Sequence, residues 1–147
     1  MAGVTYDTSL IIAYKLSDLP DNFFMSAVVL LELIAGANDA SIIKAYEAVR
    51  RRHDKEGTLI VPSSEDWLLA SKVLSWLAQG RKKKAGGKSP PLIKGASQRM
   101  ALDALLAASA RRVGVTVVTN NWNHFRAIQY YCNVKLRRGS EFIKGRK

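Results

Sequence analysis

Short apolar runs alternate with helical patterns along the whole chain. Runs rich in β-branched and aromatic residues predict strands at 4–6, 23–25, 59–61, 115–119 and 134–136. Between these runs, apolar residues recur at helical spacing within 10–14, 27–37, 41–55, 64–77, 96–113 and 121–131. Because strands that alternate with helices form parallel sheets covered on both faces, the pattern predicts an α/β fold with a mainly parallel sheet of about five strands.

Polar residues mark where the predicted helices begin. Thr8 or Ser9 is the expected N-cap of the first helix and Ser26 that of the second, because their hydroxyls can accept from free backbone N–H groups. In the helix at 64–77, Trp67 and Trp76 are expected in the core rather than as platforms for nucleic-acid bases.

Three acids stand in apolar surroundings. Asp7 follows the first strand and precedes a helix, whose N-terminus stabilises an anion. Glu32 has apolar or very small neighbours at helical spacing, and Asp103 is flanked by alanines and leucines. Because burying a carboxylate without a partner is costly, these positions indicate a functional site. A helix-capping role for Asp7 and a solvent-reaching role for Glu32 are the alternatives.

The strand order brings these acids to one edge of the predicted sheet. The strand at 115–119 is followed by Asn121, and the carboxyl ends of parallel strands share an edge, so Asn121 is expected near Asp7. Glu32 and Asp103 approach from helices. Since nearby carboxylates repel unless a cation neutralises them, the cluster predicts a Mg²⁺ or Mn²⁺ site. One cysteine and two histidines do not supply a zinc-binding set.

The composition adds a polyanionic partner to this picture. The 23 Lys and Arg residues exceed the 12 Asp and Glu residues, and the net charge of +11 makes nucleic acid the first candidate. At 147 residues, the chain fits one domain spanning 1–147. Cys132 is the only cysteine, and no apolar run reaches the roughly 20 residues of a membrane helix. We therefore expect a soluble, cytoplasmic protein without membrane contact.

Positive charge is concentrated near 81–91, where the helical periodicity breaks and two glycines precede a Pro-Pro pair. The cations of this segment expected to contact RNA are Arg81, Lys82, Lys83, Lys84 and Lys88. The composition predicts a flexible basic loop with salt-sensitive affinity for phosphate. A solvated surface insertion is the alternative. Together, oxygen ligands and a basic surround favour metal-assisted hydrolysis of phosphodiesters.

Three blocks follow one another in order and are spread over nearly the whole chain: VTYDTSLIIAY, MSAVVLLELIAGA and LDALLAASARRVGVTVVTNNWNHF. They resemble the blocks of PIN-domain ribonucleases, most closely the VapC-type toxins of toxin–antitoxin pairs. The resemblance implies a PIN-like three-layer α/β/α sandwich, Mg²⁺- or Mn²⁺-dependent endoribonuclease activity on RNA, and inhibition by a cognate antitoxin. The apolar helices at 27–37 and 121–131 are candidates for pairing with a second copy, as a homodimer, or with an antitoxin helix.

The resemblance also implies roles for single residues. Asp7, Glu32 and Asp103 match the first three acids of the family, which are catalytic and bind metal. Thr119 matches a threonine whose hydroxyl orients an acid. Ser9 matches a small polar residue that is often found two positions after the first acid.

Asn121 and His124 depart from the family pattern. Asn121 stands where many relatives carry a fourth acid, and His124 where another Asp commonly precedes the Phe that Phe125 matches. Asn121 stays in the predicted catalytic and metal-binding set because its carbonyl oxygen can bind a metal or its water, but the lost charge lowers affinity for a second cation. One-metal occupancy and a catalytically impaired RNA-binding module are therefore open alternatives. A Rossmann-type nucleotide-binding protein is disfavoured, because the glycine fingerprint is missing after the first strand.

Overall fold

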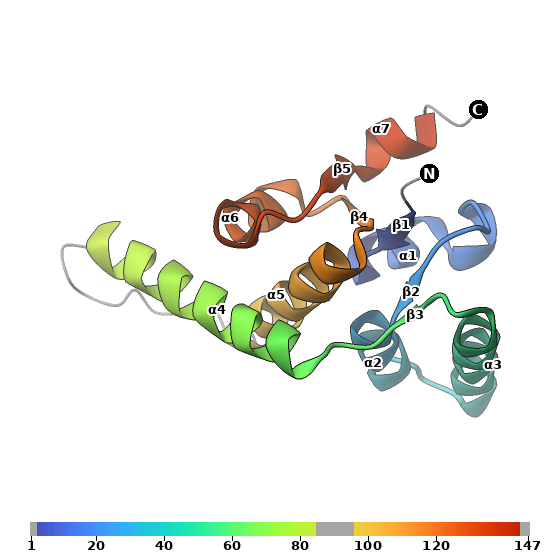
Figure 1. Cartoon of the computed structure of the whole chain (residues 1–147). Coiled ribbons are helices and arrows are strands. Elements are labelled where there is room, and N and C mark those ends of the chain that lie inside the picture. The colour runs from blue at the N-terminus through green and yellow to red at the C-terminus, as the bar shows by residue number, and fades with distance from the viewer. Residues whose placement is uncertain (1–2, 85–95, 145–147) are drawn as a thin grey trace.

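The chain forms short parallel strands enclosed by helices. The computed structural model describes residues 3–84 and 96–144 (Figure 1). The strands in this part are β1 (Val4–Tyr6), β2 (Met25–Ser26), β3 (Leu59–Ile60), β4 (Thr116–Thr119) and β5 (Leu136–Arg138). The helices are α1 (Thr8–Tyr14), α2 (Ala27–Ala35), α3 (Ala40–Glu56), α4 (Ser64–Lys84), α5 (Ala96–Val113), α6 (Trp122–Cys132) and α7 (Gly139–Lys144), with a 3-10 turn at Leu16–Asp18. The predicted α/β fold is confirmed.

The strands pair in parallel, as the sequence pattern predicts. β1, β4 and β5 form one sheet in the order β1-β4-β5, and β2 pairs with β3. The two parts meet at a bridge between Thr5 and Phe24, where the Phe24 N–H donates to the Val4 carbonyl at 2.8 Å. The spatial order of the strands is therefore β5-β4-β1-β2-β3, and the carboxyl ends of β1 and β4 share one edge.

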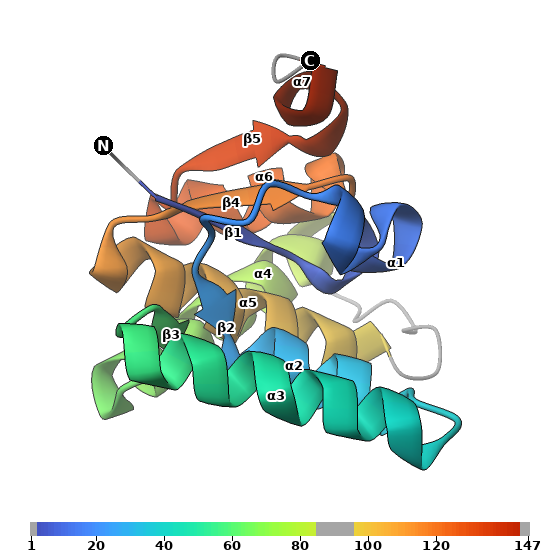
Figure 2. The ribbon, with the colours of Figure 1, turned by 90° about the vertical axis from the view of Figure 1, so that its right-hand side faces the viewer.

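Helices cover both faces of the strands. α4, α5 and α6 lie on one side, and α1, α3 and α7 lie on the other (Figures 1 and 2). α5 is buried at every position from 104 to 110, where four alanines allow close approach of the neighbouring elements. Asp103 directly precedes this buried run. The fold thus sets this acid at the boundary between the core and a more exposed helix end.

The first helix begins at a different cap from the one expected. Asp7, not Thr8 or Ser9, is the N-cap of α1, and its Oδ1 accepts from the Leu10 N–H at 3.0 Å. Aspartate is as good a cap as serine or threonine, and the chain passes from β1 into the helix without an intervening turn. Ser26 is confirmed as the cap of α2.

Helix α4 is longer than predicted. It continues to Lys84, so positions 81–84 belong to a helix and not to the expected loop near 81–91. Lysine and arginine are good helix formers, and the loss of apolar periodicity that marked the predicted boundary does not end a helix by itself. Lys88 lies outside the described residues. Within 3–84 and 96–144, none of the helices combines the length and hydropathy that a membrane span needs.

The tryptophans of α4 were expected in the core, but both are exposed. Trp67 is 59% exposed and Trp76 is 37% exposed, whereas Ala70 and Val73 form the buried face of the helix. Small residues let α4 pack closely against α5, and the bulky indoles lie outside this contact.

The C-terminal strand lies two residues further along than predicted. β5 starts at Leu136 instead of 134, because its pairing with β4 begins where the Val117 N–H donates to the Lys135 carbonyl at 2.9 Å. Val134 is a buried residue before the strand. The short helix α7, which the pattern did not predict, follows β5 directly.

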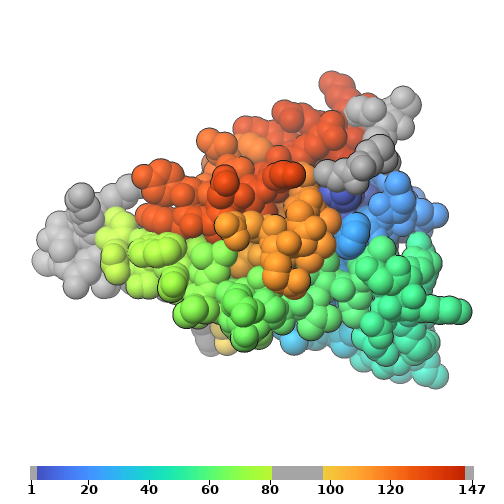
Figure 3. Space-filling view, viewed as in Figure 1, coloured from blue at the N-terminus to red at the C-terminus, as the bar shows by residue number. Residues whose placement is uncertain are grey.

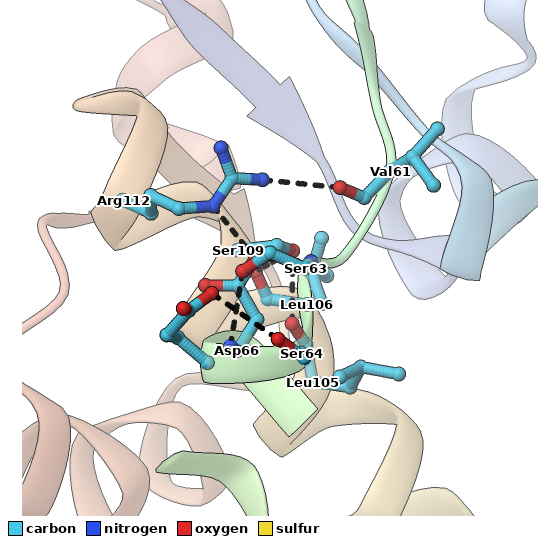
Figure 4. Close-up of polar contacts among 9 residues, drawn as sticks. Val61, Ser63, Ser64, Asp66, Leu105, Leu106, Ser109 and Arg112 are labelled. Carbon is cyan, nitrogen blue, oxygen red and sulfur yellow. Dashed lines mark hydrogen bonds and ion pairs between the residues drawn. The ribbon is translucent and has the colours of Figure 1, made fainter. Parts of the chain in front are cut away.

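A hydrogen-bond network joins the start of α4 to the end of α5 (Figure 4). The Ser63 N–H donates to Asp66 Oδ2 at 2.9 Å, and the Asp66 N–H donates to Ser63 Oγ at 3.2 Å, which is a reciprocal capping arrangement. Arg112 donates to the same carboxylate oxygen at 2.8 Å and to the Val61 carbonyl at 3.0 Å. The hydrogen bonds of Arg112 fix the end of α5, the helix that carries Asp103. On the same side of the strands, α6 lies against α4 (Figure 3).

Candidate active site

Asp7 is held rigidly at the carboxyl edge of the sheet. Its side chain is buried, with the residue only 3% exposed. Besides the bond from the Leu10 N–H, Oδ2 accepts from the Thr119 hydroxyl at 2.6 Å, and the Ser9 hydroxyl lies 2.9 Å from both carboxylate oxygens. The Asp7 N–H donates to the Val118 carbonyl at 3.2 Å and extends the pairing of β1 with β4. The orientation of this carboxylate is therefore set by three donors.

Thr119 connects the end of β4 to the start of α6. Its fully buried hydroxyl donates to Asp7 and accepts from the Asn121 N–H at 2.9 Å. The Asn121 side chain is exposed and makes no cap hydrogen bond to α6. Its amide is therefore accessible to a ligand at this edge.

Glu32 approaches from α2. The Thr8 hydroxyl donates to Glu32 Oε1 at 3.0 Å, so the residue next to Asp7 positions the second acid. Glu32 is half-buried and also borders a hollow of about 200 Å³ between α1, α2 and α3. It does not simply reach into bulk solvent.

Asp103 lies beside His124. The Asp103 Oδ2 and His124 Nε2 atoms are 3.0 Å apart, with side chains that are 18% and 27% exposed. This contact is not a hydrogen bond, because the imidazole nitrogen has no aligned partner. A hollow of about 410 Å³ opens beside this pair, and its lining residues are Arg99, Met100, Asp103, Asn121 and His124.

The three acids share one electrostatic neighbourhood. Burial raises the pKa of the Asp7 carboxyl above its ordinary value, although hydrogen bonds from Thr119, Leu10 and Ser9 oppose the shift. Burial also raises the pKa of Glu32, against the hydrogen bond from Thr8. The charge of Asp103 raises the pKa of both groups further, and that of Asp7 raises the pKa of Glu32. The structure thus brings the acids into mutual repulsion across three elements.

The donor chemistry of this edge fits a hard divalent cation. Mg²⁺ and Mn²⁺ prefer carboxylate and carbonyl oxygens, and a cation would relieve the repulsion that raises the pKa values of Asp7 and Glu32. Among residues 3–84 and 96–144, however, no three His, Cys, Asp or Glu side chains are close enough together to hold a metal. The side chains of Glu32 and Asp103, bound to Thr8 and paired with His124, would have to turn toward Asp7 to complete such a site.

Several polar neighbours of the acids escaped the sequence-based analysis. The Thr8 contact to Glu32 joins residues 24 positions apart, and Arg99 lines the hollow beside Asp103 without any local motif. Arg138 is paired in register with Thr119, although the predicted strand ended before it. The side chains of the predicted basic segment lie outside the described part of the structure.

Comparisons with known proteins agree with this architecture. Residues 6–129 match the PIN domain family. The fold is similar to that of VapBC-1 from nontypeable Haemophilus influenzae, with a TM-score of 0.56, 22% identity, and coverage of 93% of this chain and 98% of the other. It is similar to DNA-bound VapBC from Salmonella typhimurium, with a TM-score of 0.55, 18% identity, and coverage of 95% and 99%. For FitAcB from Neisseria gonorrhoeae, the corresponding values are 0.53, 16%, 90% and 95%. No curated protein matches the chain significantly.

The family assignment rests on most of the chain. The matched region runs from the end of β1 through most of α6, and it contains Asp7, Glu32, Asp103 and Asn121. The protein therefore belongs to the PIN domain family, a family of nucleases, and its solved neighbours include VapBC and FitAcB complexes.

Proposed function

We propose that this protein is a metal-dependent endoribonuclease that cleaves RNA phosphodiester bonds. The observation that carries the proposal is the approach of Asp7, Glu32 and Asp103 from β1, α2 and α5 to one edge, where the charge of Asp103 adds to the burial that raises the pKa of Asp7 and Glu32. Bound Mg²⁺ or Mn²⁺ would supply the charge that activates water and stabilises the scissile phosphate.

The residues of this edge have distinct roles in the proposal. Asp7, Glu32 and Asp103 would hold the cation, with the Asn121 carbonyl as a fourth oxygen donor. Thr119 and Ser9 hold the Asp7 carboxylate in one orientation, and Thr8 does the same for Glu32. His124 lies in contact with Asp103. These contacts orient each acid separately, and a bound cation would draw the Glu32 and Asp103 side chains toward Asp7.

The charge of the chain supports a nucleic-acid substrate. The net charge of +11 attracts a polyanion, and we assign phosphate contacts to Arg81, Lys82, Lys83, Lys84 and Lys88. These contacts are independent of sequence, so they supply affinity and not the choice of a cleavage site.

We also propose that the protein is the toxin of a toxin–antitoxin pair and is neutralised by a cognate antitoxin. The similarity of its fold to VapBC and FitAcB supports this assignment. A homodimer formed through its apolar helices is part of the same proposal.

Cleavage of single-stranded RNA by purified, antitoxin-free protein tests the nuclease assignment. We expect cleavage with Mg²⁺ or Mn²⁺, none with chelator, and loss of cleavage in Asp7→Asn and Asp103→Asn while circular dichroism stays unchanged. Asp54→Asn is the matched control, because Asp54 is an exposed acid on α3. No cleavage by the wild type with either ion would refute the proposal. Titration with Mn²⁺, followed by electron paramagnetic resonance, counts one ion or two.

A second function is a PIN-like RNA-binding module with impaired catalysis. It is favoured by two observations, namely that His124 lies against Asp103 and that Asn121 replaces an acid at the same edge. This function predicts RNA binding that is equal with divalent ions and with chelator, and no cleavage. A binding titration under both conditions separates the two functions.

A further inference from the structure

One aromatic and cationic cluster lies beside the acids and has no role in holding them. The Arg138 guanidinium carbon is 4.7 Å from the centre of the Trp122 ring, and that of Arg126 is 6.0 Å from it. Both distances are within the range of cation–π attraction. The three residues come from the end of β5 and the first turns of α6.

The strand register places this cluster next to the candidate active site. Arg138 is the partner of Thr119 across the β4–β5 pair, and Thr119 donates to Asp7. Neighbouring strands are about 4.8 Å apart, so the backbone of Arg138 lies one strand spacing away from Thr119, the residue that orients the buried acid. Trp122 directly follows Asn121, which lines the hollow beside Asp103.

Alternation along β5 selects one arginine for this cluster. Successive residues of a strand point to opposite faces. The Arg137 guanidinium accordingly lies 5.4 Å from the centre of the Phe142 ring in α7, whereas Arg138 faces Trp122 in α6. Arg137 supports the packing of α7, and Arg138 remains exposed on the side of α6.

The two cations of the cluster are not neutralised by acids. Within 3–84 and 96–144, neither Arg126 nor Arg138 forms an ion pair, although Arg126 donates to the Gln129 side chain at 3.1 Å. Both arginines are exposed, and Trp122 is partly exposed. An exposed guanidinium held over an indole offers its outer plane for base stacking and its N–H groups for phosphate.

We propose that Trp122, Arg126 and Arg138 bind single-stranded RNA and position it beside the acids, an inference that rests on the proposed ribonuclease function. An unpaired base stacks on the Arg138–Trp122 pair, while Arg126 contacts the adjacent phosphate. The cluster therefore helps to set which position along the RNA strand lies beside the acids. The basic segment, in contrast, attracts any phosphate backbone.

Binding of a labelled single-stranded RNA, measured by fluorescence anisotropy in chelator, tests the cluster without cleavage. We expect Arg138→Ala and Trp122→Ala to weaken binding by about 5- to 150-fold, the usual effect of losing one stacked base. Arg138→Lys, which keeps the charge but not the planar group, should recover only part of the affinity. Arg51→Ala is the matched control, because Arg51 is exposed on α3, which lies at the opposite end of the molecule from β5 (Figures 1 and 2).

The outcomes separate this inference from the nuclease proposal. Equal losses of RNA affinity in Arg138→Ala and Arg51→Ala would overturn it. A cluster variant that keeps the wild-type RNA affinity but no longer binds an antitoxin would also overturn it. If Trp122→Ala unfolds, Trp122→Phe provides the test instead, because it keeps an aromatic ring in place of the indole. RNA binding that depends on Trp122, without cleavage in Mn²⁺, would support this cluster and refute only the nuclease. Cleavage that does not depend on the cluster would do the reverse.

Discussion

Asp7 shows how one buried charge of the candidate site opposes stability. Its pKa is raised by burial, so the folded chain binds its proton more tightly than the unfolded chain does. Stability therefore falls as pH rises from the unfolded pKa toward the folded pKa, and the whole cost is present above the folded pKa. Removing this charge should relieve that cost while it abolishes cleavage.

We expect Asp7→Asn, in chelator at pH 7, to be at least as stable as the wild type. As pH falls toward 4, the wild type should gain stability relative to the variant, because native Asp7 takes up its proton first. Urea unfolding across this pH range measures the difference. Asp39→Asn should show the opposite sign, because hydrogen bonds from Ser41 and the Ile42 N–H lower the pKa of Asp39. Parallel pH profiles for Asp7→Asn and the wild type would contradict the expectation.

Thr119 carries two buried hydrogen bonds that a change of one atom can remove. Thr119→Val keeps the shape but deprives Asp7 of its shortest hydrogen bond and leaves the Asn121 N–H unpaired. We expect a loss of about 1–3 kcal/mol in unfolding free energy, together with loss of cleavage. Thr119→Ser retains the hydroxyl and should retain most of the activity. If the two variants cleave RNA equally well, the hydroxyl has no positioning role.

At the scale of elements, the packing of α4 on α5 depends on a buried cap. The Asp66 carboxylate is only 4% exposed and accepts hydrogen bonds from the Ser63 N–H and the Arg112 guanidinium. Asp66→Ala removes this acceptor. We expect a loss of about 1–3 kcal/mol, measured by urea unfolding. Asp39→Ala removes the cap of α3, which is exposed, and should cost less. A similar cost for both caps would show that burial adds nothing to the first.

The junction of β5 and α7 depends on a glycine for a steric reason. A Cβ atom at Gly139 would lie 2.3 Å from the Asn120 side-chain oxygen and 2.4 Å from a methyl carbon of the fully buried Leu10. We expect Gly139→Ala to destabilise the fold by about 1–3 kcal/mol in thermal or urea unfolding. Gly80→Ala, inside α4 with its nearest neighbouring atom at 3.6 Å, should instead stabilise the protein by up to about 1 kcal/mol.

Element order was predictable from the sequence, whereas several boundaries and faces were not. The helix at 96–113 and its glycine end at 114 are read correctly, because periodicity and a C-terminal glycine agree there. Trp67 is misplaced because a hydrophobicity pattern shows which residues are apolar, not which small residues let two helices approach. β5 is misplaced because its register depends on β4, which is a tertiary effect.

At the scale of the whole molecule, the three acids of the candidate site could be proposed from the sequence, but the side chains that contact them could not. Asp7, Glu32 and Asp103 stand out because a charge in an apolar run is unusual. Thr8 contacts Glu32, and His124 contacts Asp103, only because α1, α2, α5 and α6 meet at one edge. No local pattern encodes that meeting, so the restraint on each acid emerges only from the assembled fold.

The net charge of +11 makes a prediction about the molecule as a whole, namely that RNA affinity falls steeply with salt. Each phosphate contact on a single strand adds about 0.7 to the slope of log K against log salt concentration. Substitution of Arg81, Lys82, Lys83, Lys84 and Lys88 by glutamine should therefore reduce the slope by up to about 3.5, measured by anisotropy in chelator. Substitution of Arg50, Arg51 and Arg52 should reduce it less per cation removed, because Arg50 and Arg52 already pair with Asp54 and Glu56. A slope that responds to charge number alone, whatever its position, would mean that the basic segment attracts RNA only through the overall field of the protein.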